Sequence, residues 1–264
     1  MMSAWNPEDY HRHSSQQQKW AQDILARLSL REHERVLDIG CGDGKVTAEI
    51  ARLAPRGFVL GLDAATEMIE FARRNFPPED FPNLRFEIGD AKSLRFENEF
   101  DCVVSFACLH WVIDHRPVLA GIRRALVPGG KILLQFGGKG NAARVVEAVS
   151  NVTTRPKWAP YFSGFQFPWG FYGPDEYRPW LEEAGFTATR VVLVPKDMVH
   201  PGREGLEGWF RTTWMPYVQR LPEALQQDFL IESVDEYLRE NPADRDGLVH
   251  LAMTRLEVEA IKPR

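Results

Sequence analysis

The chain has 264 residues, of which 44% are hydrophobic and 26% are charged. This length and apolar content indicate one large α/β domain or two small ones, and they exclude a largely disordered protein. The 32 Lys and Arg residues against 37 Asp and Glu residues give a formal net charge of −5 at pH 7. Such an acidic balance argues against a protein built mainly to bind nucleic acid.

Neither a secretion signal nor a membrane span is expected. Residues 1–20 lack the apolar core of a signal peptide, and the apolar run Cys102–Ile113 is shorter than the roughly 18 residues that a membrane span needs. The three cysteines lack CxxC spacing and are typical of reduced thiols. No His, Asp or Glu residues have the spacing of metal ligands. We therefore expect a cytoplasmic protein without a metal or a membrane partner.

Short apolar segments alternate with amphipathic helical segments through the first half of the chain. In chain order, the pattern predicts strand Arg35–Ile39, helix Lys45–Ala54, strand Phe58–Asp63, helix Thr66–Asn75, strands Leu84–Ile88 and Phe100–Phe106, helix His115–Val127, a turn at Val127–Gly130 and strand Lys131–Phe136. Strands joined by helices of this length indicate βαβ units and a doubly wound parallel sheet.

The second half is less regular. We expect helices over Asn141–Val152, Pro174–Ala184 (ended by Gly185) and most of 203–240, and strands over Ala188–Val194 and within Leu248–Ile261. Ten of the 30 aromatic residues lie within Trp158–Trp180. This segment is interpreted either as a lid that closes over a ligand or as a small core of its own.

A glycine-rich loop connects the first strand to the first helix. The three glycines of Gly40–Gly44 let the backbone turn tightly and leave room for a ligand beside the free N–H groups of the helix start. Asp63 ends the second strand, where an acidic residue can accept hydrogen bonds from ribose hydroxyls. Asp38 precedes the loop; this acid would repel a pyrophosphate but suits a cationic ligand such as S-adenosylmethionine. Asp90, after the third strand, could accept a hydrogen bond from an adenine amine.

Five segments of this half resemble the class I S-adenosylmethionine-dependent methyltransferases: VLDIGCGDG, GLDAATEMI, GDAKSL, FDCVVSFACLHW and LVPGGKILLQF. The resemblance covers roughly residues 35–136. It implies an α/β, Rossmann-like, doubly wound and mostly parallel seven-stranded sheet that binds S-adenosyl-L-methionine at the carboxyl ends of its strands. We expect a single domain over 1–264, with lid and substrate-binding insertions within about 141–245. The cofactor-binding residues that the resemblance implies are Tyr10, Asp38, Gly40, Cys41, Gly42, Asp63, Ala64, Met68, Asp90, Ala91 and Phe106.

The residues after the fourth strand bear on what is methylated. Enzymes that methylate exocyclic amines of nucleic acids carry an Asn/Asp-Pro-Pro-aromatic turn there, whereas Ala107–Trp111 contains neither proline nor a side-chain amide. The segment Ser105–Trp111 and the amino terminus resemble two groups of carboxylate O-methyltransferases, those of trans-aconitate and of juvenile hormone acid. Trp5–Tyr10 and Phe171–Tyr177 again resemble the trans-aconitate group. A small-molecule acid is therefore favoured over a nucleic acid as the acceptor.

A carboxylate acceptor also fits the lack of a recognisable catalytic base, because a carboxyl group with a pKa of about 4 is already ionised at pH 7. The resemblance points to Trp111 and Gln17 as hydrogen-bond donors that position this carboxylate, and His110 could assist them. An arginine of the late helical segment could bind a second carboxylate. The candidate substrate-binding residues are Trp169, His200, Arg211 and Arg220.

Two other interpretations stay open at this point. The protein could methylate an amine, a hydroxyl or a carbon of another metabolite, which would require a base such as His110 or His200. It could also bind S-adenosylmethionine without catalysis. The sequence is equally compatible with a monomer and a homodimer.

Overall fold

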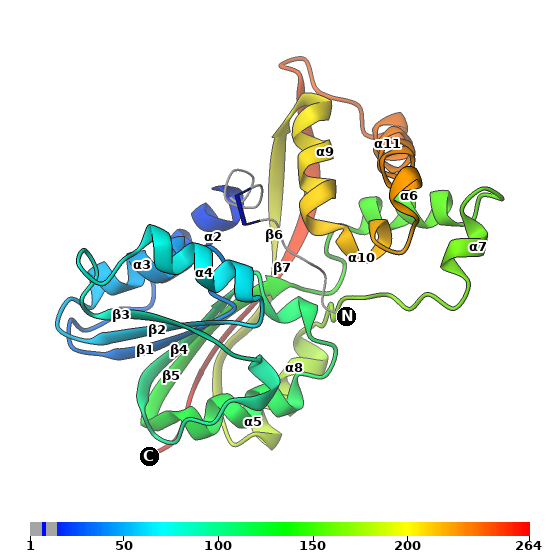
Figure 1. Cartoon of the computed structure of the whole chain (residues 1–264). Coiled ribbons are helices and arrows are strands. Elements are labelled where there is room, and N and C mark those ends of the chain that lie inside the picture. Colours follow the sequence, from blue (N-terminus) through cyan, green and yellow to red (C-terminus); the bar gives the residue numbers. More distant parts are fainter. Residues whose placement is uncertain (1–6, 9–14) are drawn as a thin grey trace. The chain divides into compact units, whose positions relative to one another are not determined.

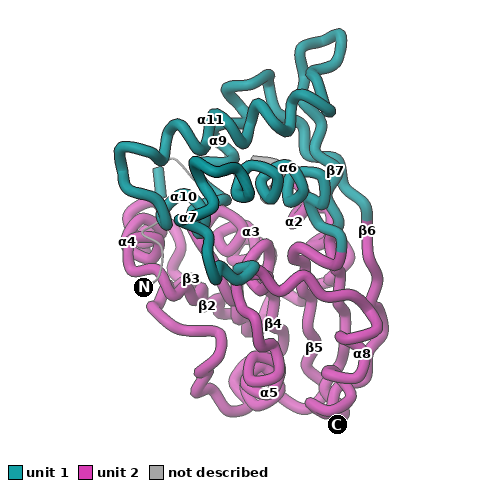
Figure 2. The backbone as a smooth tube through the Cα atoms, turned by 90° about the vertical axis from the view of Figure 1, so that its right-hand side faces the viewer, with its two compact units in different colours: residues 1–13, 140–168, 195–254 teal, residues 14–139, 169–194, 255–264 magenta. Residues whose placement is uncertain are grey.

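The computed structural model describes residues 7–8 and 15–264, with only the backbone for residues 15–18. The chain divides into two compact units, each of which is described by itself (Figure 2). Unit 1 consists of residues 1–13, 140–168 and 195–254, and unit 2 of residues 14–139, 169–194 and 255–264. The chain therefore passes between the units several times.

Unit 2 is built on a seven-stranded sheet with the strand order β3-β2-β1-β4-β5-β7-β6 (Figure 1). The strands β1 to β5 pair in parallel, and β7 pairs antiparallel with β5. β6 and β7 each continue from unit 2 into unit 1. The strands are β1 (Arg35–Ile39), β2 (Phe58–Asp63), β3 (Leu84–Ile88), β4 (Phe100–Phe106), β5 (Leu126–Gly137), β6 (Thr187–Pro201) and β7 (Leu248–Ile261).

Helices cover both faces of this sheet, so that unit 2 has one apolar core on each face. One core joins the sheet to α2, α3 and α4, and the other joins it to α5, α8 and the two short 3-10 helices. These elements are α2 (Ser15–Leu25), α3 (Lys45–Leu53), α4 (Thr66–Asn75), η1 (Ala91–Ser93), η2 (Leu109–Trp111), α5 (Arg116–Ala125) and α8 (Pro174–Glu183). A three-layer α/β/α architecture follows from the alternation of apolar strands and amphipathic helices.

Unit 1 is mainly helical and has its own aromatic core. Trp158 is fully buried against Phe229, and Phe162 stacks on the same ring at 5.2 Å. The indole N–H of Trp158 donates to Glu232 at 2.9 Å. The helices are α6 (Ala143–Thr153), α7 (Ala159–Phe162), α9 (Gly202–Thr213), α10 (Met215–Val218) and α11 (Glu223–Glu240). Within residues 7–8 and 15–264, no helix combines the length and the apolar character of a membrane span.

The expected fold class is confirmed. The four strands β1 to β4 begin and end where the sequence pattern predicts. The strand expected within Leu248–Ile261 is confirmed as β7, which occupies this whole range. The turn expected at Val127–Gly130 is wrong, because these residues belong to β5. The register between β4 and β5 shifts there, and Gly129 takes a positive φ of 82°, so that the strand accommodates the Pro-Gly-Gly sequence as an irregularity.

The aromatic segment Trp158–Trp180 is divided between the units. Its first part, up to Pro168, belongs to unit 1, where Trp158 packs in the helical core described above. Its second part begins at Trp169 and belongs to unit 2. Trp158 therefore packs in the helical core of unit 1 together with residues outside the segment, and closure of the segment as a lid stays a prediction.

His115 shapes the loop that follows β4. Its side chain is fully buried, with Nδ1 2.8 Å from the Tyr177 hydroxyl and Nε2 within hydrogen-bond distance of the Leu109 and Val112 carbonyls. Burial lowers the pKa of His115 to about 4. The neutral ring therefore donates from Nε2 to the two carbonyls and accepts at Nδ1 from Tyr177. This arrangement fixes the 3-10 turn η2.

The depressed pKa of His115 predicts a pH-dependent stability. Between its unfolded pKa of about 6.5 and its folded pKa of about 4, the unfolded chain binds more protons, so stability is fully present above pH 6.5 and is lost as pH falls. We expect a loss of about 2–3 kcal/mol over this window. Urea unfolding of the wild type and His115→Gln between pH 4.5 and 8 measures it. Equal pH slopes for both proteins would contradict the assignment.

Candidate active site

The glycine-rich loop between β1 and α3 has a backbone that only glycine adopts without strain. Gly40, Gly42 and Gly44 have φ values of 76°, 54° and 85°. At Gly40 there is also no space, because a Cβ atom would lie 2.1 Å from the Cys108 sulfur. The loop therefore packs directly against the residues that follow β4.

Asp63 holds this loop from the end of β2. One of its carboxylate oxygens accepts from the Gly42 N–H and the other from the Ala65 N–H, each at 2.9 Å. Burial raises the pKa of Asp63, and the two backbone hydrogen bonds oppose this rise. The carboxylate thus joins the glycine loop to the start of α4. Each oxygen keeps a second lone pair with which it can accept a bond from a ligand hydroxyl.

Asp38 is a buried carboxyl group one step before the loop. It is 2% exposed and accepts a hydrogen bond from the Thr47 hydroxyl at 2.7 Å. Burial raises its pKa to about 7, with a further rise from nearby Asp63 and a partial reduction by Thr47. A buried acid of this kind is stabilised in its ionised form by a cationic partner.

The remaining cofactor candidates lie around these two acids in unit 2. Asp90 caps η1 by accepting from the Lys92 N–H at 2.9 Å, and Ala91 begins this turn. Met68 is buried in α4, Cys41 is buried in the glycine loop, Ala64 is exposed after β2, and Phe106 ends β4. The structure thus gathers the expected residues at the carboxyl ends of β1, β2, β3 and β4 and just beyond them, and their role as ligands stays a prediction.

A group of aromatic side chains, called the aromatic cluster below, includes residues that follow β4 in the same unit. It consists of His110, Trp111, Trp169 and Phe171. Trp111 packs edge-on against Trp169 at 5.8 Å, and Trp169 stacks on Phe171 at 5.9 Å. His110 lies 5.6 Å from Trp111 and 6.1 Å from Phe171, and its carbonyl accepts from the Gly170 N–H. Two segments far apart in the sequence therefore form one cluster.

His110 is held in one neutral form. The Gly137 N–H donates to its Nδ1 at 3.3 Å, which places the ring proton on Nε2. Burial lowers the pKa of His110 well below its usual value, and the charge of Arg255 lowers it further. His110 is therefore a hydrogen-bond donor near pH 7 rather than a base.

The other predicted residues lie elsewhere or outside the described part. His200, Arg211 and Arg220 belong to unit 1: His200 is buried beside Trp209, Arg211 is exposed, and Arg220 donates to the carbonyls of Tyr161 and Ser163. Tyr10 lies outside the described residues. Gln17 lies in α2, but its side chain is not described.

Sequence reasoning missed Phe171 as a member of the cluster, and it missed Arg255. Arg255 lies in β7, is only 4% exposed, and its guanidinium carbon is 4.8 Å from the ring centre of Trp20. The sequence of β7 could have revealed Arg255. Every second side chain of a strand points to the same face, so Arg255 lies on the same face as Val249, Leu251 and Met253. A charged residue that follows three buried apolar residues on one face of a strand and is itself buried indicates a functional or paired group.

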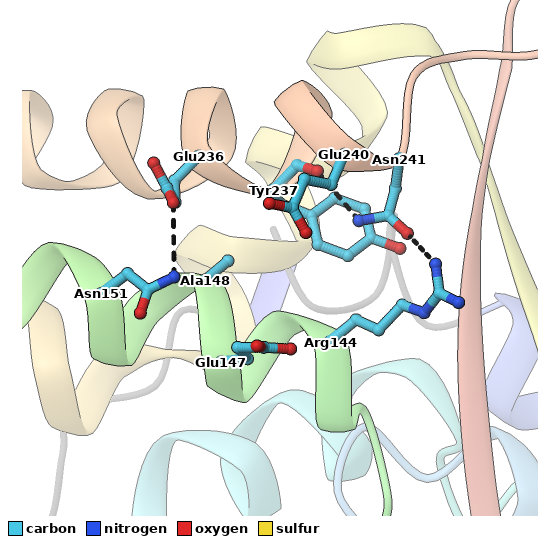
Figure 3. A pocket seen from close by; sticks show the side chains of 8 residues that line it. All are labelled: Arg144, Glu147, Ala148, Asn151, Glu236, Tyr237, Glu240 and Asn241. Atoms are coloured by element: carbon cyan, nitrogen blue, oxygen red, sulfur yellow. Dashed lines mark hydrogen bonds between the residues drawn. The ribbon is translucent and has the colours of Figure 1, made fainter.

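Unit 1 contains a cavity of about 330 Å³ between α6 and α11 (Figure 3). Arg144 at one end donates to Asn241, and Asn151 at the other donates to Glu236. Three glutamates line the cavity against a single arginine, so it would repel an anionic acceptor. The lining residues are Arg144, Glu147, Ala148, Asn151, Glu236, Tyr237, Glu240 and Asn241.

Comparison with known proteins decides the family. Residues 36–130 match the family model described as "Methyltransferase domain". The chain is 32% identical to a trans-aconitate 2-methyltransferase of Deinococcus radiodurans over 98% of both chains. The chain belongs to the class I S-adenosylmethionine-dependent methyltransferases. A trans-aconitate 2-methyltransferase of Variovorax paradoxus is 31% identical to this methyltransferase over 99% of both chains.

Solved structures support the fold of the methyltransferase. The YcgJ protein of Bacillus subtilis superposes with a TM-score of 0.64 at 17% identity, covering 92% of this chain and 98% of the other. The phosphoethanolamine N-methyltransferase 2 of Haemonchus contortus, solved with S-adenosyl-L-methionine, gives a TM-score of 0.58 at 23% identity over 93% and 53% of the two chains. The expected family, enzyme class and fold are confirmed.

The residues present fit S-adenosylmethionine as the methyl donor. Buried Asp38 suits a ligand with a cationic amino group, and Asp63 at the tip of β2 has spare lone pairs for hydroxyl donors. The loop Gly40–Gly44 brings backbone N–H groups to the same edge of the sheet. These three features lie within unit 2.

The close contact at Gly40 predicts that a side chain there destabilises the protein by more than backbone strain alone. Gly129→Ala, at a φ of 82° with its nearest neighbour at 3.5 Å, should cost only the left-handed strain of about 1–2 kcal/mol. Gly40→Ala should cost about 1–3 kcal/mol more, because its Cβ collides with Cys108. Chemical denaturation compares both variants, and equal losses of stability would contradict the contact.

The raised pKa of Asp38 predicts how cofactor binding depends on pH. Below pH 7 Asp38 is protonated in the free enzyme and must lose this proton to pair with a cation, so affinity should fall by up to about tenfold per pH unit below pH 7 and level off above it. Titration calorimetry with S-adenosylmethionine between pH 5.5 and 8 measures the slope. Asp38→Asn should bind weakly with a flat profile. A flat wild-type profile would contradict a role for the Asp38 charge.

Proposed function

We propose that this methyltransferase esterifies a carboxylate of a small organic acid, in the manner of the trans-aconitate methyltransferases that it resembles. The observation that carries the proposal is the protonation state of His110. Its Nδ1 lone pair is engaged by Gly137 and its pKa is far below 7, so His110 is not available as a base at neutral pH. Burial also raises the pKa of Cys108, which keeps this neighbouring thiol protonated.

An acceptor beside this cluster must therefore arrive already deprotonated. A carboxylic acid meets this requirement at neutral pH, whereas an alcohol or an alkylammonium group does not. When it is bound, S-adenosylmethionine supplies an electrophilic methyl group. The chain's own task is then to orient the acceptor and to exclude water, and both favour a reaction in which opposite charges neutralise each other.

The aromatic cluster provides the means for both tasks. The stacked rings of Trp169 and Phe171 and the edge of Trp111 form an apolar wall that excludes water. The Trp111 indole N–H and His110 Nε2–H are neutral donors that can hold one carboxylate oxygen without placing a counter-charge on it. We assign Trp111 and His110 to positioning the acceptor; Gln17 and Tyr10 stay predictions.

Turnover on a panel of acceptors tests the proposal. The purified protein should convert carboxylic acids to methyl esters that mild alkali cleaves, and it should leave amines and phenols unmethylated. For acids, kcat/KM measured at saturating S-adenosylmethionine should be flat from pH 6 to 8, because the cofactor then stays bound while Asp38 titrates and His110 does not titrate in this range. Amine or phenol turnover with a rise in rate around pH 6–7 would contradict the proposal and favour a base such as His200.

Substitution of Trp111 tests the assigned donor. Trp111→Phe keeps an aromatic ring but removes the N–H, so kcat/KM for the acid should fall by about 100-fold through lost orientation. Its affinity for S-adenosylmethionine should stay within about twofold. Trp180→Phe is a matched control, since Trp180 packs edge-on against Tyr172 outside the cluster, and it should change kcat/KM by less than about threefold. Equal losses in both variants would reject the assignment.

A further inference from the structure

Arg255 is a buried cation that is linked to the aromatic cluster through its strand partner Gly137. In the register of β5 and β7 it lies opposite Gly137, the residue whose N–H donates to His110. Its guanidinium lies over the ring of Trp20 in α2, and its exposed fraction is 4%. All of these residues belong to unit 2. Gly137 brings no side chain between β7 and the cluster.

The two charged residues that follow Arg255 on this face of β7 are acids. Glu257, the next residue on the same face, pairs with Arg27 at 2.7 Å and Arg190 at 3.2 Å and accepts from Gln135 at 3.1 Å. Glu259 lies 4.0 Å from each of the two arginines. Glu257 and Glu259 thus belong to acid–base pairs, and Arg255, in the middle of β7, is the charged residue that lies opposite Gly137.

Cys108 and His110, two residues apart in the turn after β4, are influenced by groups of opposite charge. The acids Asp63 and Asp38 act on Cys108 and, after burial itself, raise the pKa of its thiol. Arg255 acts on His110 and, again after burial, lowers the pKa of the imidazole. Acidic groups therefore influence Cys108, and a cation influences His110. A cationic methyl donor on the acid side and an anionic acceptor on the arginine side match this polarity.

We propose that Arg255 binds the acceptor through a carboxylate that is not methylated. This inference rests on the proposed function. A guanidinium fork engages both oxygens of a carboxylate, whereas the reacting oxygen must keep a lone pair free for the methyl group. The neutral donors Trp111 and His110 suit the carboxylate that is methylated. The full charge of Arg255 suits the second carboxylate, which is not methylated. The site then selects acids with at least two carboxylates.

Kinetics with a series of acids tests this assignment. Arg255→Met removes the charge at similar length, so KM for a dicarboxylic or tricarboxylic acid should rise by about 30- to 100-fold, with kcat within about threefold. KM for a monocarboxylic acid of similar size should change by less than about threefold. Arg255→Lys, which keeps the charge without the fork, should lie between the two. An unchanged preference for polycarboxylic over monocarboxylic acids in Arg255→Met would overturn the proposal.

Two further variants separate binding from a structural role. Trp20→Leu removes the ring beneath the guanidinium and keeps the charge, so the preference for polycarboxylic acids should remain. Arg116→Met removes an arginine that stacks on Trp180 at the same distance of 4.8 Å, and it should leave the preference unchanged. A uniform fall of kcat for all acids in both Arg255→Met and Trp20→Leu would show a structural role and overturn the proposal.

A binding measurement distinguishes failure of this inference from failure of the proposed function. If the wild type methylates no acid, the proposed function fails. Calorimetry with propane-1,2,3-tricarboxylate in the presence of S-adenosylhomocysteine then tests Arg255 separately. Binding by the wild type that weakens at least about 30-fold in Arg255→Met supports the anion site. Equal binding by both proteins, or none by the wild type, overturns it.

Discussion

The absence of a side chain at Gly40 is the constraint on which the candidate site depends. Because a Cβ at this position would collide with Cys108, the loop after β1 and the turn after β4 occupy neighbouring space only with glycine there. This contact brings two chemically different parts together. The loop carries the backbone N–H groups and lies between Asp38 and Asp63, and the turn leads directly into His110 and Trp111.

The two histidines of this region, His110 and His115, are kept neutral by their surroundings. His115 is buried among aromatic rings and bonded to two carbonyls, and His110 is bonded to a backbone N–H beside a buried arginine. Both imidazoles are thereby removed from proton chemistry near pH 7. A site assembled in this way works by orientation and exclusion of water, which is the form of catalysis that an already ionised acceptor needs.

The sequence predicted the cofactor half closely because local signals coincide there. Short apolar runs, glycines at the loop and acids at strand ends all point to the same βαβ arrangement, and β1 to β4 end where expected. The Pro-Gly-Gly segment was misjudged because turn-forming residues also occur in strand irregularities, and Gly129 supplies the positive φ that such an irregularity needs. Phe171 and Arg255 were missed for another reason. Phe171 contacts His110, and Arg255 lies opposite Gly137, only through pairings between distant parts of the chain. Neither helical nor strand periodicity records which segment a side chain will face.

The position of β7 in the strand order has a consequence for the nascent chain. β5 is translated well before β7, and until β7 pairs with it the outer edge of β5 exposes unpaired backbone groups flanked by apolar residues such as Ile132 and Leu134. Such an edge is a template for pairing with another chain. Unit 2 is therefore complete only after a late, non-local pairing of β7 with β5. A chaperone that shields the edge of β5 would act before this pairing brings Arg255 to the site.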